Sequence, residues 1–162
     1  MDTSIRSSPA SLPRRAKILV VDDEAVIRDL ETQILESLGH EVLQSATGED
    51  ALRMAREHQP DLILLDILMP PGLTGIQVCH ELRADKHTRD IRVIIVTAVD
   101  AKHALEESII AGADDFLAKP ISPVELIVRV RSMLRVRNIQ DDEKRLEAYI
   151  RSMQELRSSS EK

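Results

Sequence analysis

The chain has 162 residues, which is enough for one domain with short extensions but too few for two full domains. Its net charge of −6 gives no general attraction to DNA or anionic lipid, and one Phe, one Tyr and no Trp leave no base-stacking platform for single-stranded nucleic acid. Hydrophobic residues make up 43% of the chain, so we expect an aliphatic core. The single cysteine, Cys79, rules out an internal disulfide and is compatible with a reducing compartment.

Residues 1–15 are rich in Ser, Pro and Arg and show little periodicity, which indicates a flexible leader. The start of the chain is polar and lacks the apolar segment of a signal peptide. Uncharged apolar runs such as Ile63–Leu65 and Val93–Val96 are far too short to cross a membrane. We therefore expect a cytoplasmic protein that makes no membrane contact.

From Lys17 onward, the chain repeats a unit in which a short apolar run precedes a stretch with helical spacing of apolar residues. The predicted strands are Lys17–Val21, Glu41–Ser45, Leu62–Leu65, Val93–Val96 and Asp115–Ala118. The predicted helices are Glu24–Leu38, Gly48–His58, Ile76–Leu82, Ala101–Ala111 and Pro123–Arg137. Continuous apolar strands are typical of a sheet that is covered on both faces. Residues 16–137 are thus predicted to form an α/β domain, a doubly wound five-stranded parallel sheet of order 2-1-3-4-5 with helices on both faces.

Polar residues follow or end four of these strands: Asp22 and Asp23, Asp66, Thr97 and Lys119. The carboxyl ends of parallel strands share one edge of a sheet, so these side chains should converge. Clustered carboxylates repel one another unless a cation lies among them, and ligands that are all oxygen favour Mg²⁺. A carboxylate nucleophile, an ammonium and a hydroxyl in one place suit the transfer of a phosphoryl group.

With these motifs, the chain resembles the response-regulator receiver family of two-component signalling, the CheY-like superfamily. The resemblance covers about Lys17 to Arg137, and each motif falls at the expected strand end. The matching segments are Val20–Glu24 (VVDDE), Leu64–Pro70 (LLDILMP), Val96–Ala98 (VTA) and Ala118–Pro120 (AKP).

The resemblance implies a phosphoacceptor and a metal site. Asp66 would accept the phosphoryl group from a histidine kinase or a phosphotransfer protein. Asp23 would bind Mg²⁺ directly and Asp22 through water, and Asp66 and the backbone carbonyl of Leu68 would complete the protein ligands. Such a protein is not an enzyme in the usual sense, although it assists its own phosphorylation and dephosphorylation.

The resemblance also implies a switch. Lys119 would pair with the phosphoryl group, Thr97 would donate a hydrogen bond to it, and Phe116 would be the aromatic residue that rotates inward. The bond between Lys119 and Pro120 would be cis. The chain departs from the family at two places: Gly75 comes one residue later than is usual, and Arg92 stands where the family often has proline.

Beyond Arg137 the pattern changes to an amphipathic tail, residues 138–162, which is predicted to be helical and to act as a short coiled coil or an output linker. The tail and the last receiver helix would together form a homodimer. No direct contact with nucleic acid is expected. The residues on heptad positions a and d are Ile139, Leu146, Tyr149, Met153 and Leu156, with Asp142 interrupting the series.

Other interpretations of the same residues stay open. Asp22 and Asp23 could cap the helix that follows them, and Phe116 could be an ordinary core residue. The chain could be a receiver-fold scaffold that is never phosphorylated, or the receiver fragment of a longer regulator. A flavodoxin-like cofactor binder is disfavoured because acids, not glycines, follow the first strand. Because the apolar residues Leu68 and Val99 would flank the hydrolytic water, we expect slow loss of the phosphoryl group.

Overall fold

The computed structural model describes residues 15–98 and 101–160; Val99 and nearly all of the predicted leader lie outside these ranges. The described residues form one five-stranded parallel sheet in the order β2-β1-β3-β4-β5, which confirms the predicted fold class and strand order. The strands are β1 (Lys17–Val21), β2 (Glu41–Ser45), β3 (Leu62–Leu65), β4 (Arg92–Thr97) and β5 (Asp115–Ala118).

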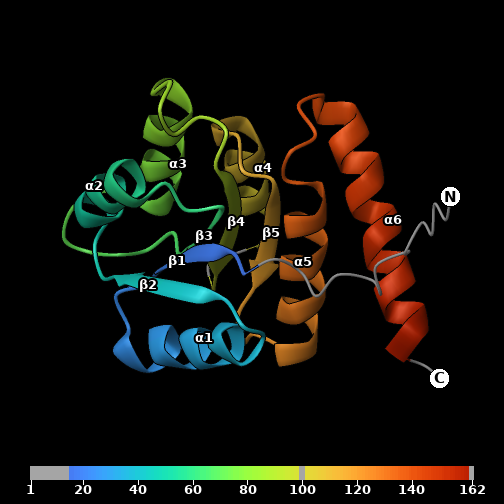
Figure 1. Cartoon of the computed structure of the whole chain (residues 1–162). Helices are drawn as coiled ribbons and strands as arrows, with labels where there is room; N and C mark the ends of the chain where they lie inside the picture. The colour runs from blue at the N-terminus through green and yellow to red at the C-terminus, as the bar shows by residue number, and fades with distance from the viewer. Residues whose placement is uncertain (1–14, 99–100, 161–162) are drawn as a thin grey trace, which may run out of the picture.

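Six helices lie within the described ranges and cover both faces of the sheet (Figure 1). One core cluster packs sheet side chains against α2, α3 and α4, and a second packs the opposite side chains against α1, α5 and α6. None of these helices is long and apolar enough to cross a membrane. The helices are α1 (Ala25–Ser37), α2 (Gly48–His58), α3 (Gly75–Ala84), α4 (Ala101–Ala111), α5 (Pro123–Val136) and α6 (Asp142–Ser160).

The central strands β3 and β4 are buried along their whole length, as their continuous apolar sequence predicts. Successive side chains of a strand point to opposite faces, so Ile63 enters the first core cluster while Leu64 enters the second. The predicted β4 was one residue short at each end, because Arg92 and Thr97 also pair in the sheet. These two polar residues therefore mark the opposite edges of the sheet.

The apolar residues of α1 do not all face the core. Val26 and Leu30 are 80% and 46% exposed, whereas the polar residues Glu31 and Thr32 are buried with Leu35. The helix has thus turned so that the face carrying Leu35 packs under the sheet and the face carrying Val26 meets solvent. Helical spacing alone did not identify this face, because apolar residues occur on more than one side of the helix.

The loop between β3 and α3 approaches its own start closely at Gly75. The Gly75 amide donates a hydrogen bond to the Ile67 carbonyl (2.8 Å), and a Cβ on Gly75 would lie 2.1 Å from the backbone oxygen of Asp66. Only glycine fits this position. Gly75 comes one residue later than is usual in the family, and the loop before it takes up the extra residue. The Pro70–Pro71 bond in that loop is cis, which the sequence did not predict.

The tail forms a helix, as predicted, and α6 packs alongside α5 as the outermost element of the molecule (Figure 1). Tyr149 is only 3% exposed, and Met153 is half-buried against the second core cluster. Ile139, which precedes α6, packs against the same cluster, so three of the predicted heptad residues face this chain's own receiver domain. Leu146 and Ile150 on the same helix stay exposed, at 54% and 44%.

Candidate functional site

Asp22 and Asp66 lie side by side because they directly follow two paired strands. β1 and β3 run parallel with Val21 opposite Leu65, and the Asp66 amide donates to the Val21 carbonyl (3.0 Å). Carboxylate oxygens of Asp22, Asp23 and Asp66 all lie within 4.8 Å of one another. Asp22 and Asp66 are buried and Asp23 is exposed, so one side of this cluster is open to solvent. The predicted convergence of the three acids is therefore found.

Lys119 supplies the cation at this edge. Its Nζ donates to Oδ2 of Asp22 (2.7 Å) and to Oδ2 of Asp66 (3.2 Å). Its backbone amide is fixed by the Thr97 carbonyl (2.9 Å), and the Lys119–Pro120 bond is cis, as expected. We call Asp22, Asp23, Asp66 and Lys119 together the acidic site. Three carboxylates face one ammonium there, which leaves a net negative charge.

The surroundings raise the pKa values of two of these groups, Asp66 and Lys119, for different reasons. Burial raises the pKa of the Asp66 carboxyl; the charge of Lys119 opposes this shift and that of Asp22 adds to it. Burial alone would lower the pKa of Lys119, but its hydrogen bond to Asp22 and the charge of Asp66 raise it. Lys119 is therefore held as a cation between two acids.

Asp22 has a second partner, which bears on the interpretation of this residue as a helix cap. Its Oδ1 accepts the amide of Glu24 (2.9 Å), and Glu24, not Asp22, is the N-cap residue of α1. The Asp22 carbonyl accepts from the guanidinium of Arg28 (2.8 Å). Asp22 thus orders the start of α1 with one oxygen and faces Lys119 with the other.

Thr97 and Phe116 lie on the neighbouring strands β4 and β5. Thr97 ends β4, is 1% exposed and lies opposite Ala118. Phe116 is half-buried and packs against the first core cluster. Thr97 therefore shares the edge of the acidic site, while Phe116 lies two positions back along β5 and contributes to the core.

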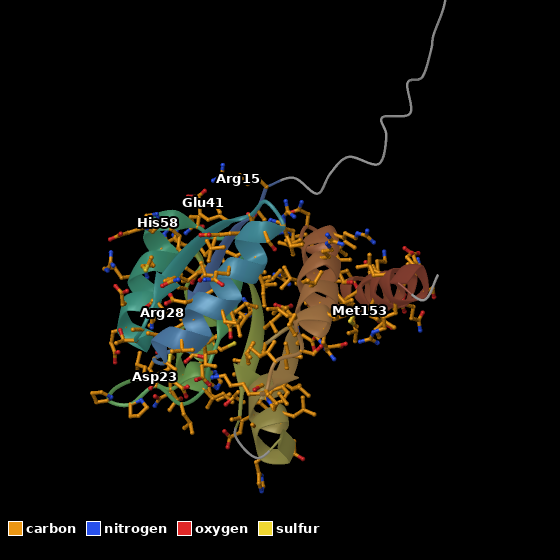
Figure 2. All side chains as sticks on the ribbon, turned by 90° about the horizontal axis from the view of Figure 1, so that it is seen from below. Arg15, Asp23, Arg28, Glu41, His58 and Met153 are labelled. Atoms are coloured by element: carbon orange, nitrogen blue, oxygen red, sulfur yellow. The ribbon has the colours of Figure 1, made fainter. Side chains whose placement is uncertain are left out.

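The loop after Asp66 carries Leu68, whose side chain is 56% exposed. Asp66 is fixed at the start of this loop because its Oδ1 accepts the Ile67 amide (2.8 Å). Figure 2 shows Asp23 at the same end of the molecule as this loop, and Arg15 and Glu41 at the opposite end. Solvent reaches the site from the loop side.

Sequence reasoning missed Glu31, a buried acid close to this site. Glu31 is 2% exposed, and its Oε1 has no hydrogen-bond partner in the described part of the chain. Burial and then the charge of Asp22 raise the pKa of Glu31 to about 8, while Lys119 acts in the opposite direction. The signal in the sequence was its spacing, four residues from both Ile27 and Leu35 on one helix face.

The chemistry of the acidic site suits a metal ion. All of its candidate ligand atoms are carboxylate oxygens, which hard divalent cations prefer, and the excess negative charge favours a cation. Cys79 lies elsewhere, buried beneath α4, where burial raises the pKa of its thiol to about 11. It is a packed core residue.

Comparison with known proteins gives a consistent result. The family model of the response regulator receiver domain matches residues 18–131. The chain is 43% identical over 139 residues to the response regulator PleD of Caulobacter vibrioides, covering 85% of this chain and 30% of that protein. It is 38% identical over 130 residues to the phosphate regulon transcriptional regulatory protein PhoB of Pseudomonas aeruginosa, covering 80% of this chain and 56% of PhoB.

Solved structures agree in fold. A CheY-like response regulator receiver domain protein from Methanospirillum hungatei superposes with a TM-score of 0.72 at 28% identity, covering 78% of this chain and 99% of that one. NtrX from Brucella abortus superposes with a TM-score of 0.72 at 31% identity, covering 78% of this chain but only 28% of NtrX. The chain spans less than two thirds of PleD, PhoB and NtrX. With its family match, strand order and acidic site, the chain belongs to the response regulator receiver domain family of two-component signalling.

Proposed function

We propose that this receiver domain is a phosphorylation-controlled switch in which Asp66 accepts a phosphoryl group. The observation that carries the proposal is the acidic site itself, in which Asp66 lies within reach of Lys119 and of two further carboxylates. A carboxylate oxygen of Asp66 would attack the phosphorus atom. The bond from phosphorus to the donor's histidine nitrogen would break, and the imidazole would leave as it gains a proton.

Asp22, Asp23, Asp66 and the backbone carbonyl of Leu68 are the groups that would hold Mg²⁺. When bound, Mg²⁺ supplies the positive charge that the acidic site lacks for an incoming phosphoryl group. Lys119 already bridges Asp22 and Asp66, so it is positioned to follow the new charge on Asp66. Thr97, at the same edge, would donate its hydroxyl to the phosphoryl group, and Phe116 would then repack on β5.

The partners follow from this chemistry. A histidine kinase or a phosphotransfer protein would donate the phosphoryl group, in the cytoplasm. PhoB is named a transcriptional regulator, and the expectation that this chain itself makes no nucleic-acid contact rests on its net charge of −6 and its few aromatic residues. PleD and NtrX are much longer than this chain, which supports the alternative that an output domain belongs to the same regulator.

A homodimer through α5 and the tail remains part of the proposal, with one change. Because α6 already packs on α5, a second copy would meet the outward residues Leu146 and Ile150, or the two copies would exchange their α6 helices. Measuring the mass in solution with and without beryllofluoride distinguishes a dimer that depends on activation from a constant oligomeric state.

The test of the main proposal is intact mass spectrometry after incubation with acetyl phosphate and Mg²⁺. The wild-type chain should gain one phosphoryl group, and it should gain none in EDTA or as the variant Asp66→Asn. Asp50→Asn, which removes an exposed carboxylate on α2, is the matched control and should label like the wild type. A wild type that stays unmodified while a known receiver is labelled would favour the non-phosphorylated scaffold.

A further inference from the structure

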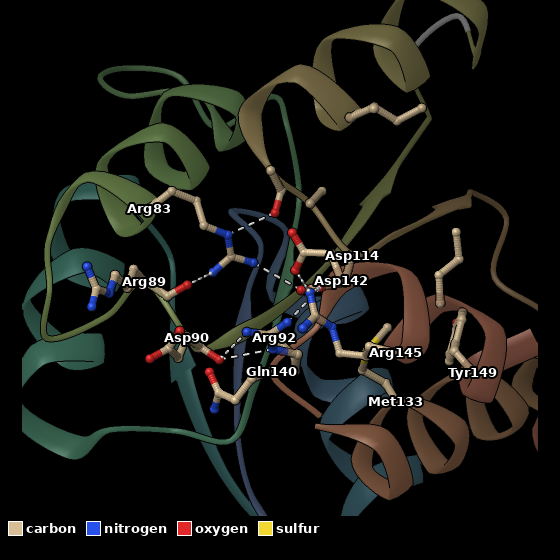
Figure 3. Close-up of a pocket in the computed structure, with 14 residues that line it drawn as sticks. Arg83, Arg89, Asp90, Arg92, Asp114, Met133, Gln140, Asp142, Arg145 and Tyr149 are labelled. Atoms are coloured by element: carbon tan, nitrogen blue, oxygen red, sulfur yellow. Dashed lines mark hydrogen bonds and ion pairs between the residues drawn. The ribbon is translucent and has the colours of Figure 1, made fainter. Parts of the chain in front are cut away.

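A cleft of about 520 Å³ opens at the amino-terminal edge of the sheet, opposite the acidic site (Figure 3). Arg92 at the start of β4 lines it, whereas Thr97 at the end of β4 lies at the other edge, roughly 16 Å away at about 3.3 Å per strand residue. The ends of α3 and α4 form one side of the cleft, and α6 closes the other. The cleft therefore exists only because the tail folds back on the receiver domain.

The buried part of this cleft holds an excess of positive charge. Asp114 is the shared partner of Arg83 (3.0 Å), Arg92 (3.1 Å) and Arg145 (3.5 Å). The side chain of Arg92 is 7% exposed and that of Arg145 is 12% exposed, so these charges are poorly screened by water. Burial lowers the pKa of Arg92; the charge of Asp114 opposes this shift, and the two neighbouring guanidiniums add to it. We call this group, with Arg89, the arginine cleft.

The other carboxylates that line the arginine cleft do not cancel this excess. Asp142 pairs with Arg145 (2.6 Å), but its side chain is 92% exposed. Asp90 is also exposed, and it holds Arg92 through its backbone carbonyl. Both carboxylates therefore remain hydrated at the mouth, while the guanidiniums converge below them.

The guanidiniums are held rigidly in place. Arg83 donates to the carbonyls of Gly112 (2.9 Å) and Ile91 (2.6 Å) as well as to Asp114. Arg89 differs, because its side chain is exposed and turned away from the converging guanidiniums, with no hydrogen bond or ion pair to any described residue (Figure 3). The cationic floor is therefore already in place to meet an anion, and the exposed Arg89 side chain has to swing toward the cleft to join it.

The remaining wall of the cleft is apolar. Ile109 from α4 is 65% exposed and Leu146 from α6 is 54% exposed, and Met133 and Tyr149 lie deeper. A cavity of this size, with apolar walls and a few converging charged groups, is typical of small-molecule sites. The ligand that fits both halves has an anionic head and an apolar body.

From this arrangement we propose that the arginine cleft binds a small organic anion, a phosphate monoester or a carboxylate that carries an apolar group. The head lies on the floor formed around Asp114 and is met by Arg89, and the body packs between Ile109 and Leu146. This site is independent of the chemistry at Asp66 and needs no metal.

The test uses the full chain in EDTA, titrated with phenyl phosphate, inorganic phosphate and phenylacetate and followed by amide NMR shifts. Phenyl phosphate should produce saturable shifts at Arg92, Ala113 and Tyr149. It should bind at least about tenfold more tightly than inorganic phosphate, because only phenyl phosphate reaches the apolar wall. Phenylacetate decides whether a carboxylate head serves as well as a phosphate.

Variants test separately the contacts to the anionic head and to the apolar body of the ligand. Arg89→Gln, an exposed change that leaves the fold intact, should weaken both phosphates several-fold, and Arg145→Gln should weaken them more. Arg151→Gln, an exposed arginine on the same helix but outside the cleft, should bind like the wild type. Ile109→Ala should weaken phenyl phosphate and leave inorganic phosphate unchanged. Three outcomes would overturn the proposal. They are shifts confined to the Asp66 edge, no saturable shift, and equal binding by Arg89→Gln and Arg151→Gln.

Discussion

The two edges of this sheet carry opposite excesses of charge, and they handle them differently. At the acidic site, three carboxylates share one ammonium, and Asp23 is exposed so that a cation can enter from solvent. At the arginine cleft, three guanidiniums share Asp114 and are also tied to backbone carbonyls. The excess negative charge of the acidic site can be neutralised by a cation from solvent, which suits reversible binding. The excess positive charge of the arginine cleft is carried by guanidiniums that are hydrogen-bonded to backbone carbonyls. These guanidiniums serve first to join α3, β4 and α6.

Asp114→Asn gives the largest expected effect and tests whether the arginine cleft is a buried charge cluster. Removing the one shared carboxylate leaves Arg83 and Arg92 without an acidic partner and Arg145 with only the exposed Asp142, and we expect the free energy of unfolding to fall by about 3–5 kcal/mol. Asp142→Asn removes another carboxylate that pairs with Arg145, but from an exposed position, and should cost less than about 1 kcal/mol. Urea unfolding followed by circular dichroism measures both. Equal losses would mean that the arginine cleft is not a buried charge cluster.

A pH series on Glu31→Gln tests the acidic edge. In the wild type, Glu31 is protonated in both states well below pH 4.5, and its folded form keeps the proton up to about pH 8. Between these values only the unfolded chain has lost the proton, so wild-type stability falls by roughly 1.4 kcal/mol per pH unit. The variant lacks this slope, and its advantage should grow from pH 5 to pH 8 and then level off.

Metal-free unfolding curves of Glu31→Gln at several pH values measure this advantage. Glu36→Gln, an exposed change on the same helix, is the control and should give no advantage at any pH. A constant difference between Glu31→Gln and the wild type across the range would show that Glu31 is ionised in the folded state.

The effect of Mg²⁺ on the stability of Lys119→Ala and of Asp114→Asn distinguishes the two edges of the sheet. Removal of the ammonium leaves Asp22 and Asp66 without their cation, and we expect a loss of about 2 kcal/mol in EDTA. Mg²⁺ should restore most of that loss, because a ligand that binds the folded state stabilises it. The same ion should not rescue Asp114→Asn. Thermal melts of both variants with and without Mg²⁺ decide this, and a Lys119→Ala melt that ignores Mg²⁺ would count against a metal at the acidic site.

The smallest expected effect concerns the joint between α6 and β5. The Tyr149 hydroxyl donates to Asp115, which also accepts from Arg129. Tyr149→Phe keeps the packing and removes one of the hydrogen-bond donors to Asp115, so we expect a loss of about 1 kcal/mol in unfolding free energy. Tyr149→Ala should cost several times more because the ring is buried. If the two variants were equally destabilised, the hydroxyl and not the ring would hold the tail.

The acidic site could be predicted because its residues follow strands that the sequence marks clearly. Once Leu62–Leu65 and Lys17–Val21 are assigned as neighbouring parallel strands, Asp22 and Asp66 must meet at one edge. The same argument gave the positions of Thr97 and Lys119. Their roles in phosphoryl transfer remain predictions that rest on the family resemblance.

The arginine cleft could not be predicted in this way. It depends on Arg145, whose position is set by how α6 folds back, and on Arg83 at the end of a helix. The heptad pattern predicted the helix but not its partner, since an apolar stripe packs equally well on another chain or on its own domain. Glu31 was missed for a related reason: the buried face of α1 is decided by tertiary packing rather than by its apolar count.

The contact between Tyr149 and Asp115 also gives the molecule an optical property. Tyr149 is the only tyrosine in a chain that has no tryptophan, so all tyrosine emission comes from a single ring on α6. Burial and the charge of Asp115 raise the pKa of that phenol, so the ring stays un-ionised at the alkaline pH where a free tyrosine ionises. A phenol that is hydrogen-bonded to a carboxylate emits weakly. Release of α6 from β5 should therefore brighten the protein without any added label, and a stopped-flow trace would show whether phosphorylation causes such a release.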